Sequence, residues 1–143
     1  MQRERFLVRA YGDDINATRF GLVQLLNLIS NSEHAVIVVP GFEHLKDSML
    51  STVLGADLAK RLIKQRAILL EEGKKISLCS ALTLKNFKNA NIYLALCSSK
   101  YTLQDIEELH QWRALIFVTW LPEEADEWIA KHEVKVLLDA VGG

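Results

Sequence analysis

The stretch that decides the fold is AVIVVPG, residues 35–41. Five consecutive apolar residues followed by Pro-Gly are typical of a strand that is buried on both faces, as the inner strands of parallel sheets are. The run is too short for an ordinary helix, and the Pro-Gly pair gives it a clear end. We therefore expect residues 35–39 to form a central strand of a parallel sheet.

The rest of the chain alternates between strand-like and helix-like segments. Further apolar runs of strand length lie at residues 6–11, 76–79, 92–97, 114–119 and 134–138. Between them, apolar residues at helical spacing predict helices at 15–29 with Asp14 or Asn16 as N-cap, at 48–72, at 81–88, at 102–112, and from Pro122 onward. The helix at 48–72 is longer than a typical sheet, so we expect it either to kink, with Gly55 as its weak point, or to protrude at one end. This alternation requires crossover connections. We predict an α/β fold, Rossmann-like or flavodoxin-like and doubly wound, with a mostly parallel sheet of five or six strands.

Length and composition fit one α/β domain over residues 1–143, since 50% of the residues are apolar and 24% are charged. The final Gly142-Gly143 also suits a domain excised from a longer protein. No apolar run approaches the ~18 residues of a membrane span, and no signal-peptide core follows Met1. We expect a cytoplasmic protein with no membrane contact, whose Cys79 and Cys97 are reduced core thiols.

The charges are unevenly distributed along the chain. Residues 45–100 contain ten Lys/Arg and four Asp/Glu, whereas residues 101–143 contain three and nine. This uneven charge distribution would create an electric field that can orient a partner domain or a second copy of the chain. Solvated helix faces of opposite charge also explain the distribution. Nucleic acid is an unlikely partner, because the basic segment 60–66 has no groove-reading motif or aromatic platform beside it.

A small-molecule or nucleotide ligand is expected at the carboxyl ends of the strands, where open parallel sheets bind their ligands. Phosphate-loop and dinucleotide fingerprints are absent from the sequence. An anionic group should meet residues 98–102, where hydroxyls and an ammonium precede any carboxylate. The candidate ligand-binding residues follow the strands that end near residues 11, 39 and 97: Gly12, Asp13, Asp14, Asn16, Gly41, Glu43, Ser98, Ser99 and Lys100.

Two other chemistries remain open in the sequence. Asp13, Asp14 and Glu43 could hold Mg²⁺ and support hydrolysis or phosphoryl transfer, although one of the paired aspartates can instead cap the following helix. A catalytic role for Cys97 is disfavoured by its apolar flank, and no zinc-ligand spacing is present. The sequence identifies no catalytic residue, no resident metal and no cofactor.

The leading hypothesis is a small-ligand or nucleotide-sensing domain with a regulatory or accessory role. Its pocket would lie between the turn at 12–14 and the turn at 98–100. The alternatives are a metal-assisted hydrolase or phosphoryl-transfer enzyme, and a protein-interaction module. That module would use the basic long helix or the acidic C-terminal end, which carries Trp112, Trp120 and Trp128.

Overall fold

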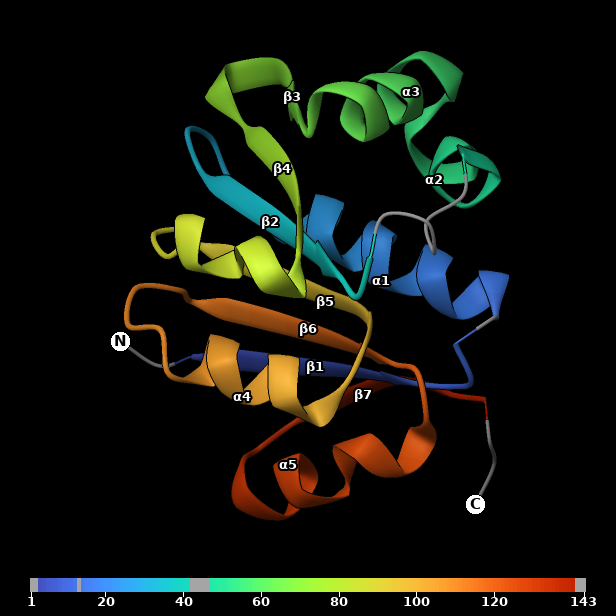
Figure 1. Cartoon of the computed structure of the whole chain (residues 1–143), viewed down its shortest axis with the longest axis vertical. Coiled ribbons are helices and arrows are strands. Elements are labelled where there is room, and N and C mark those ends of the chain that lie inside the picture. Colours follow the sequence, from blue (N-terminus) through green and yellow to red (C-terminus); the bar gives the residue numbers. More distant parts are fainter. Residues whose placement is uncertain (1–2, 13, 42–46, 141–143) are drawn as a thin grey trace.

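The computed structural model describes residues 3–12, 14–41 and 47–140. They contain the strands β1 (Glu4–Arg9), β2 (His34–Val39), β3 (Ala67–Leu69), β4 (Lys75–Ser80), β5 (Ile92–Ser98), β6 (Ala114–Thr119) and β7 (Lys135–Asp139). The strands form one sheet in the order β3-β4-β2-β5-β6-β1-β7, parallel throughout except for β3 (Figure 1). The predicted doubly wound α/β class is confirmed, with seven strands instead of five or six.

Helices cover both faces of this sheet (Figure 1). One face carries α1 (Ile15–Leu28), α2 (Asp47–Leu54) and α3 (Ala56–Gln65), and the other carries α4 (Lys100–Glu107), α5 (Asp126–Lys131) and the short 3-10 helices η3 (Ala81–Asn86) and η4 (Pro122–Ala125). A further 3-10 turn, η2 (Glu71–Gly73), joins β3 to β4. The core is therefore divided by the sheet into two layers. Within the described residues, no helix combines the length and the apolar character that a membrane span requires.

The stretch 35–39 is an inner strand, as predicted. β2 pairs in parallel with β4 on one side and with β5 on the other. Ala35, Val36, Ile37 and Val38 are fully buried. Both faces of the strand are covered by helices, so a continuous apolar run replaces the alternating pattern of a half-exposed strand.

The single long helix predicted at 48–72 is wrong. The chain forms α2 and α3, separated at Gly55, which has a φ of 86°. This break lies where we expected the kink. After α3 the backbone turns at Arg66 (φ 65°), and β3 then pairs antiparallel with β4. Leu69 therefore lies on an edge strand and is 74% exposed, because pairing with β4 outweighs the helical periodicity of this segment.

The helix predicted at 102–112 is shifted. α4 begins at Lys100 with Ser99 as its N-cap and ends at Glu107. Trp112 lies beyond the helix, is buried, and donates its indole N–H to the carbonyl of Ile106 at 2.9 Å. The Ile106 carbonyl thus accepts both the indole N–H and the backbone N–H of Leu109, and the helix ends before Trp112.

Candidate functional site

The order of the strands creates a crevice at the carboxyl edge of the sheet. After β2 the chain crosses on the face where Leu50 and Leu62 join the core, whereas after the adjacent β5 it crosses on the face of Leu103 and Ile106. β6 and β1 form a second adjacent pair of this kind, since α5 and α1 cover opposite faces. Ligands of open α/β sheets bind at such reversals.

A cavity of about 400 Å³ lies at this edge. Its volume falls within the range of small-molecule sites, roughly 300–1,000 Å³. We call it the carboxyl-edge pocket. Its lining residues come from the ends of β2, β4, β5 and β6 and from the segments that follow: Pro40, Ala81, Cys97, Ser99, Thr102, Trp120 and Glu124.

Trp120 forms an aromatic wall of the pocket. Its ring packs directly on Gly12, because a Cβ added to Gly12 would lie 1.9 Å from Cε3 of the indole. The side chain nevertheless remains 44% exposed. A side chain at position 12 would push the ring from its position. The glycine after β1 thus positions the tryptophan after β6.

The polar wall of the pocket is built around the start of α4. Ser99 Oγ accepts a hydrogen bond from the backbone N–H of Thr102 at 3.5 Å. Glu124 Oε2, from η4, accepts one from the N–H of Lys100 at 2.8 Å. The helix end where we expected an anion to bind is thus already bonded to a carboxylate. Because a carboxylate has about four acceptor positions, Glu124 can still accept hydrogen bonds from a ligand.

Cys97 connects the two turns that the sequence analysis placed on either side of a pocket. It has a φ of 53°, at the point where the pairing of β5 with β6 shifts register. Its Sγ donates to the carbonyl of Gly12 at 3.3 Å, so the end of β5 lies against the turn after β1. A left-handed backbone is uncommon for a residue other than glycine and is found at functional sites more often than elsewhere.

Of the predicted site residues, Ser99 lines the pocket, Gly12 supports its tryptophan, and Gly41 follows the lining residue Pro40. The turn after β1 and the end of β5 are neighbours, as the hydrogen bond between Cys97 and Gly12 shows. Asp13 and Glu43 lie outside the described residues.

Four other predicted residues have different roles. Asp14 caps α1, accepting a hydrogen bond from the N–H of Ala17 at 3.1 Å. Asn16 is exposed on α1. Ser98 is buried and donates to carbonyls of β2 and β5. Lys100 places its Nζ 5.5 Å from the ring centroid of Tyr101 and faces a separate groove between α4 and α5. None of these four lines the carboxyl-edge pocket.

Six lining residues were absent from the candidate list, although one of them, Thr102, lies in the stretch 98–102 where we expected an anion: Pro40, Ala81, Cys97, Thr102, Trp120 and Glu124. Pro40, Ala81 and Trp120 directly follow a strand, and Cys97 lies near the end of β5, so position alone could have included these four. Glu124 lies in the segment after the strand at 114–119, but its contact with Lys100 joins residues 24 positions apart and depends on how η4 packs.

The described residues contain no cluster that could hold a metal, and Cys79 is an unreactive thiol. No three His, Cys, Asp or Glu side chains come together there as a metal site would require. Burial raises the pKa of Cys79 to about 12, against a weaker opposing hydrogen bond with Thr83. That thiol stays protonated near neutral pH and is a poor nucleophile.

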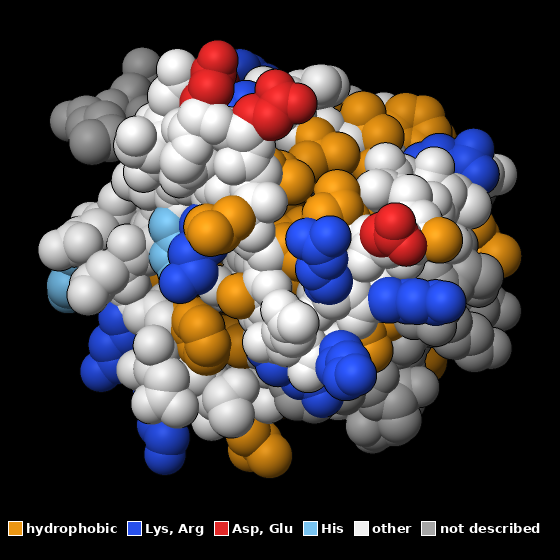
Figure 2. Space-filling model, turned by 90° about the horizontal axis from the view of Figure 1, so that it is seen from above, with side chains coloured by type: hydrophobic (Ala, Val, Ile, Leu, Met, Phe, Trp, Pro, Cys, Tyr) orange, Lys and Arg blue, Asp and Glu red, His pale blue; other side chains and the backbone are white. Residues whose placement is uncertain are grey.

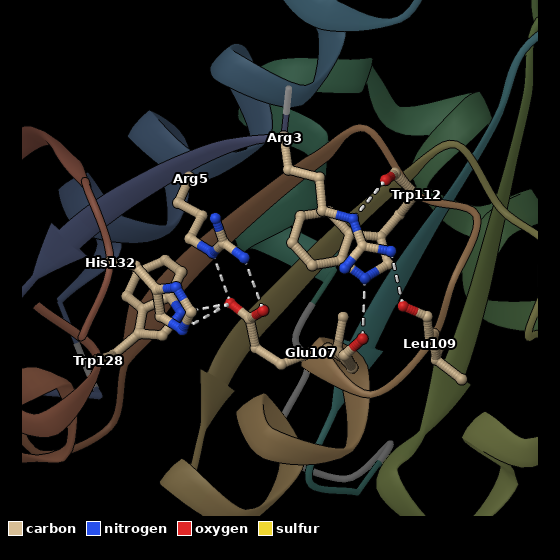
Figure 3. A network of polar contacts seen from close by, with 8 residues as sticks. Arg3, Arg5, Glu107, Leu109, Trp112, Trp128 and His132 are labelled. Carbon is tan, nitrogen blue, oxygen red and sulfur yellow. Dashed lines mark hydrogen bonds and ion pairs between the residues drawn. The ribbon is translucent and has the colours of Figure 1, made fainter. Parts of the chain in front are cut away.

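The groove between α4 and α5 has a cavity of about 240 Å³ and contains a dense polar network (Figure 3). Glu107 accepts two hydrogen bonds from Arg5 at 2.7 and 2.9 Å and one from the Trp128 indole at 2.7 Å, and His132 lies 3.9 Å away. Beside it the Arg3 guanidinium stacks 4.0 Å from the centroid of the Trp112 ring. These groups satisfy one another, so the network joins β1, α4 and α5 as a structural clamp.

Comparisons with known proteins add no identification. No protein-family model matches the sequence, and no curated protein is detectably similar to it.

Proposed function

We propose that this protein is a small-ligand-binding domain with a regulatory or accessory role, and that its ligand occupies the carboxyl-edge pocket. The observation that carries the proposal is the coincidence of that cavity with the reversal in crossover direction between β2 and β5. Pockets of this kind are usually apolar, with a few converging polar groups. Pro40, Ala81 and Cys97 supply the apolar part here.

The lining favours a planar, uncharged ligand with N–H or O–H donors, such as a nucleobase or nucleoside. The half-exposed ring of Trp120 offers a stacking surface, and stacking of a base on an aromatic side chain contributes about 1–3 kcal/mol. Glu124 provides an acceptor for an exocyclic amino group or a ribose hydroxyl. Ser99 and Thr102 are positioned to add hydroxyl contacts.

A free phosphate group is less suited to this pocket. Glu124 would repel it, and the carboxylate already compensates the positive end of the α4 dipole. We therefore expect nucleosides to bind more tightly than the matching 5′-monophosphates. This order distinguishes the pocket from a phosphate-cradling nucleotide site.

The test is a thermal-shift titration with adenosine, guanosine, cytidine and uridine, with their 5′-monophosphates and with Mg²⁺. A ligand at a hundredfold excess over its Kd adds about 2.7 kcal/mol to the free energy of unfolding. For a chain of this size the expected rise in Tm is roughly 5–10 °C. A nucleoside should give that rise, and the monophosphates less.

Two pairs of variants locate the site. Trp120→Ala should weaken nucleoside binding by roughly 5- to 150-fold, as expected from the loss of one stacked base, whereas the exposed neighbour Leu121→Ala should leave it unchanged. Glu124→Gln should reduce the difference in Kd between a nucleoside and its 5′-monophosphate, whereas substitution of the exposed neighbour, Glu123→Gln, should leave that difference unchanged. Absence of any shift across the panel, or equal binding to wild type and Trp120→Ala, would refute the proposal.

A further inference from the structure

The two edges of the sheet are available for pairing. In the described part of the chain, β3 pairs only with β4, and β7 pairs only with β1. Each edge strand also exposes an apolar side chain, Leu69 being 74% and Val136 54% exposed. Edge strands with unpaired backbone groups are templates for pairing with another chain.

The outward backbone groups of β3 can be identified from its hydrogen bonds. Leu70 N–H donates to the carbonyl of Lys74, and Leu78 N–H donates to that of Arg66. Because hydrogen-bonded and non-hydrogen-bonded pairs alternate in an antiparallel ladder, the N–H and C=O groups of Ala67 and Leu69 point away from β4. They face the position that one more strand would occupy.

The two edges lie at ends of opposite charge. Residues 56–75, which include α3 and β3, contain six Lys/Arg and three Asp/Glu. Residues 122–139, which include α5 and β7, together with the neighbouring β1, contain four Lys/Arg and seven Asp/Glu, although Arg9 of β1 pairs with Asp126 and Asp139. α3 and α5 lie at opposite ends of the long axis (Figure 1). Figure 2 views the β3 end, where Lys and Arg side chains lie beside hydrophobic ones, with some Asp and Glu side chains among them.

Strand direction permits the two ends to join. β7 is parallel to the inner strands and β3 is antiparallel to them. A second copy displaced along the sheet, without inversion, therefore presents its β3 antiparallel to β7 of the first. Pairing β7 with β7, or β3 with β3, would instead bring like-charged ends together, which disfavours a closed dimer.

We propose that copies of this protein associate head to tail, with β3 of one copy extending the sheet at β7 of the next. The occupant of each edge is thus a second copy of the same chain. Such a heterologous contact leaves one open edge at each end, so the assembly grows with protein concentration instead of stopping at a dimer. Its stability should fall with salt, since the two ends attract through exposed charges.

The experiment is sedimentation velocity of the ligand-free chain at about 0.01 M and about 1 M NaCl, where the Debye length is roughly 30 and 3 Å. At low salt the average mass should rise above 16.2 kDa with concentration and show no plateau at the dimer. At high salt it should return toward the monomer. A monomer at every concentration in low salt overturns the proposal.

Charged substitutions on each edge distinguish head-to-tail from two-fold pairing. Leu69→Glu places a carboxylate against the acidic end, and Val136→Lys places an ammonium against the basic end, so each variant alone should sediment as a monomer. An equimolar mixture should associate again, because the intact β7 of the first meets the intact β3 of the second. Leu82→Glu, which changes an 85% exposed residue on η3, is the matched control and should associate as wild type does.

The opposite outcomes exclude the head-to-tail arrangement. Dimers that persist in Leu69→Glu would show β7 pairing with itself, and dimers that persist in Val136→Lys would show the same for β3. Both substitutions change exposed side chains, and a Tm equal to that of wild type at about 1 M NaCl, where all the chains are monomeric, ensures that loss of association is not loss of folding. The result is independent of whether any nucleoside binds the carboxyl-edge pocket.

Discussion

Replacing Glu107 by Gln should destabilise the protein by removing the charge at the centre of the clamp between β1, α4 and α5. Glu107 receives two hydrogen bonds from Arg5 and one from Trp128. The amide of Gln cannot accept both guanidinium bonds, and its NH₂ group would face the cation.

The magnitude follows from burial. Breaking a fully buried ion pair costs about 3–5 kcal/mol, and a hydrogen bond to a charged group contributes roughly 1.5–3 kcal/mol. The side chains of Arg5 and Glu107 are 15% and 17% exposed, so water still reaches the pair. We expect a loss of about 2–3 kcal/mol in the free energy of unfolding at pH 7, whereas the exposed neighbour Glu108→Gln should change it by less than about 0.5 kcal/mol.

The pKa of Glu107 determines how this loss of stability depends on pH. Burial alone would raise the pKa of Glu107, but the hydrogen bonds from Arg5 and Trp128 and the charges of Arg5 and His132 outweigh it and lower the pKa below 4.5. A carboxyl with a lowered pKa in the folded state stabilises the protein above its unfolded pKa, and this contribution is lost as the pH falls through the folded pKa. The difference in free energy of unfolding between wild type and Glu107→Gln should therefore decrease below about pH 4.5.

Urea unfolding of wild type, Glu107→Gln and Glu108→Gln between neutral pH and about pH 3 provides the measurement. Equal free energies of unfolding for Glu107→Gln and Glu108→Gln at pH 7 would show that the Glu107 charge does not stabilise the fold. A difference in free energy of unfolding between wild type and Glu107→Gln that stays constant across the acid range would contradict the lowered pKa of Glu107.

Three further outcomes can be measured on single variants or on the native chain. Gly21→Ala should lower the free energy of unfolding by up to about 2 kcal/mol, because the new Cβ would lie 2.6 Å from Cγ2 of buried Val118 and overpacking exceeds the gain in helix propensity; stabilisation in urea unfolding would contradict this. Gly55→Ala should cost about 1–3 kcal/mol, since a φ of 86° strains any residue with a Cβ, and an unchanged Tm would count against it. Cys79, with its pKa near 12 through burial, should resist alkylation in the native chain at pH 8, and rapid labelling there by mass spectrometry would show that the thiol is not buried.

The sequence predicted the inner part of the fold because those segments depend on local patterns. The run at 114–119 coincides with β6, and Asp14 caps α1 as one of the two expected candidates. In both cases the signal is short-range, either a continuous apolar run or an Asx side chain before a helical period.

The failures come from contacts between distant residues. β3 exists because Ala67–Leu69 pairs with β4, and nothing in its own sequence distinguishes it from the end of a helix. The carboxylate of Glu124 at the start of α4 likewise depends on the order of the strands, which brings η4 beside that helix. Helix and strand periodicity carry no information on either of these contacts. The sequence could therefore place the pocket at the carboxyl edge of the sheet, but it could not identify all of the lining residues.

The most direct test of the proposed binding site uses the three tryptophan indole signals in a proton–nitrogen correlation spectrum during a titration with adenosine. Trp112 and Trp128 are buried and donate their indole N–H groups to Ile106 and Glu107, whereas Trp120 lines the carboxyl-edge pocket. The Trp120 signal, assigned by its loss in Trp120→Phe, should shift with saturation while the other two stay in place. A Trp128 shift would instead place the ligand in the groove between α4 and α5, and no shift of Trp120 at saturating adenosine would contradict the account.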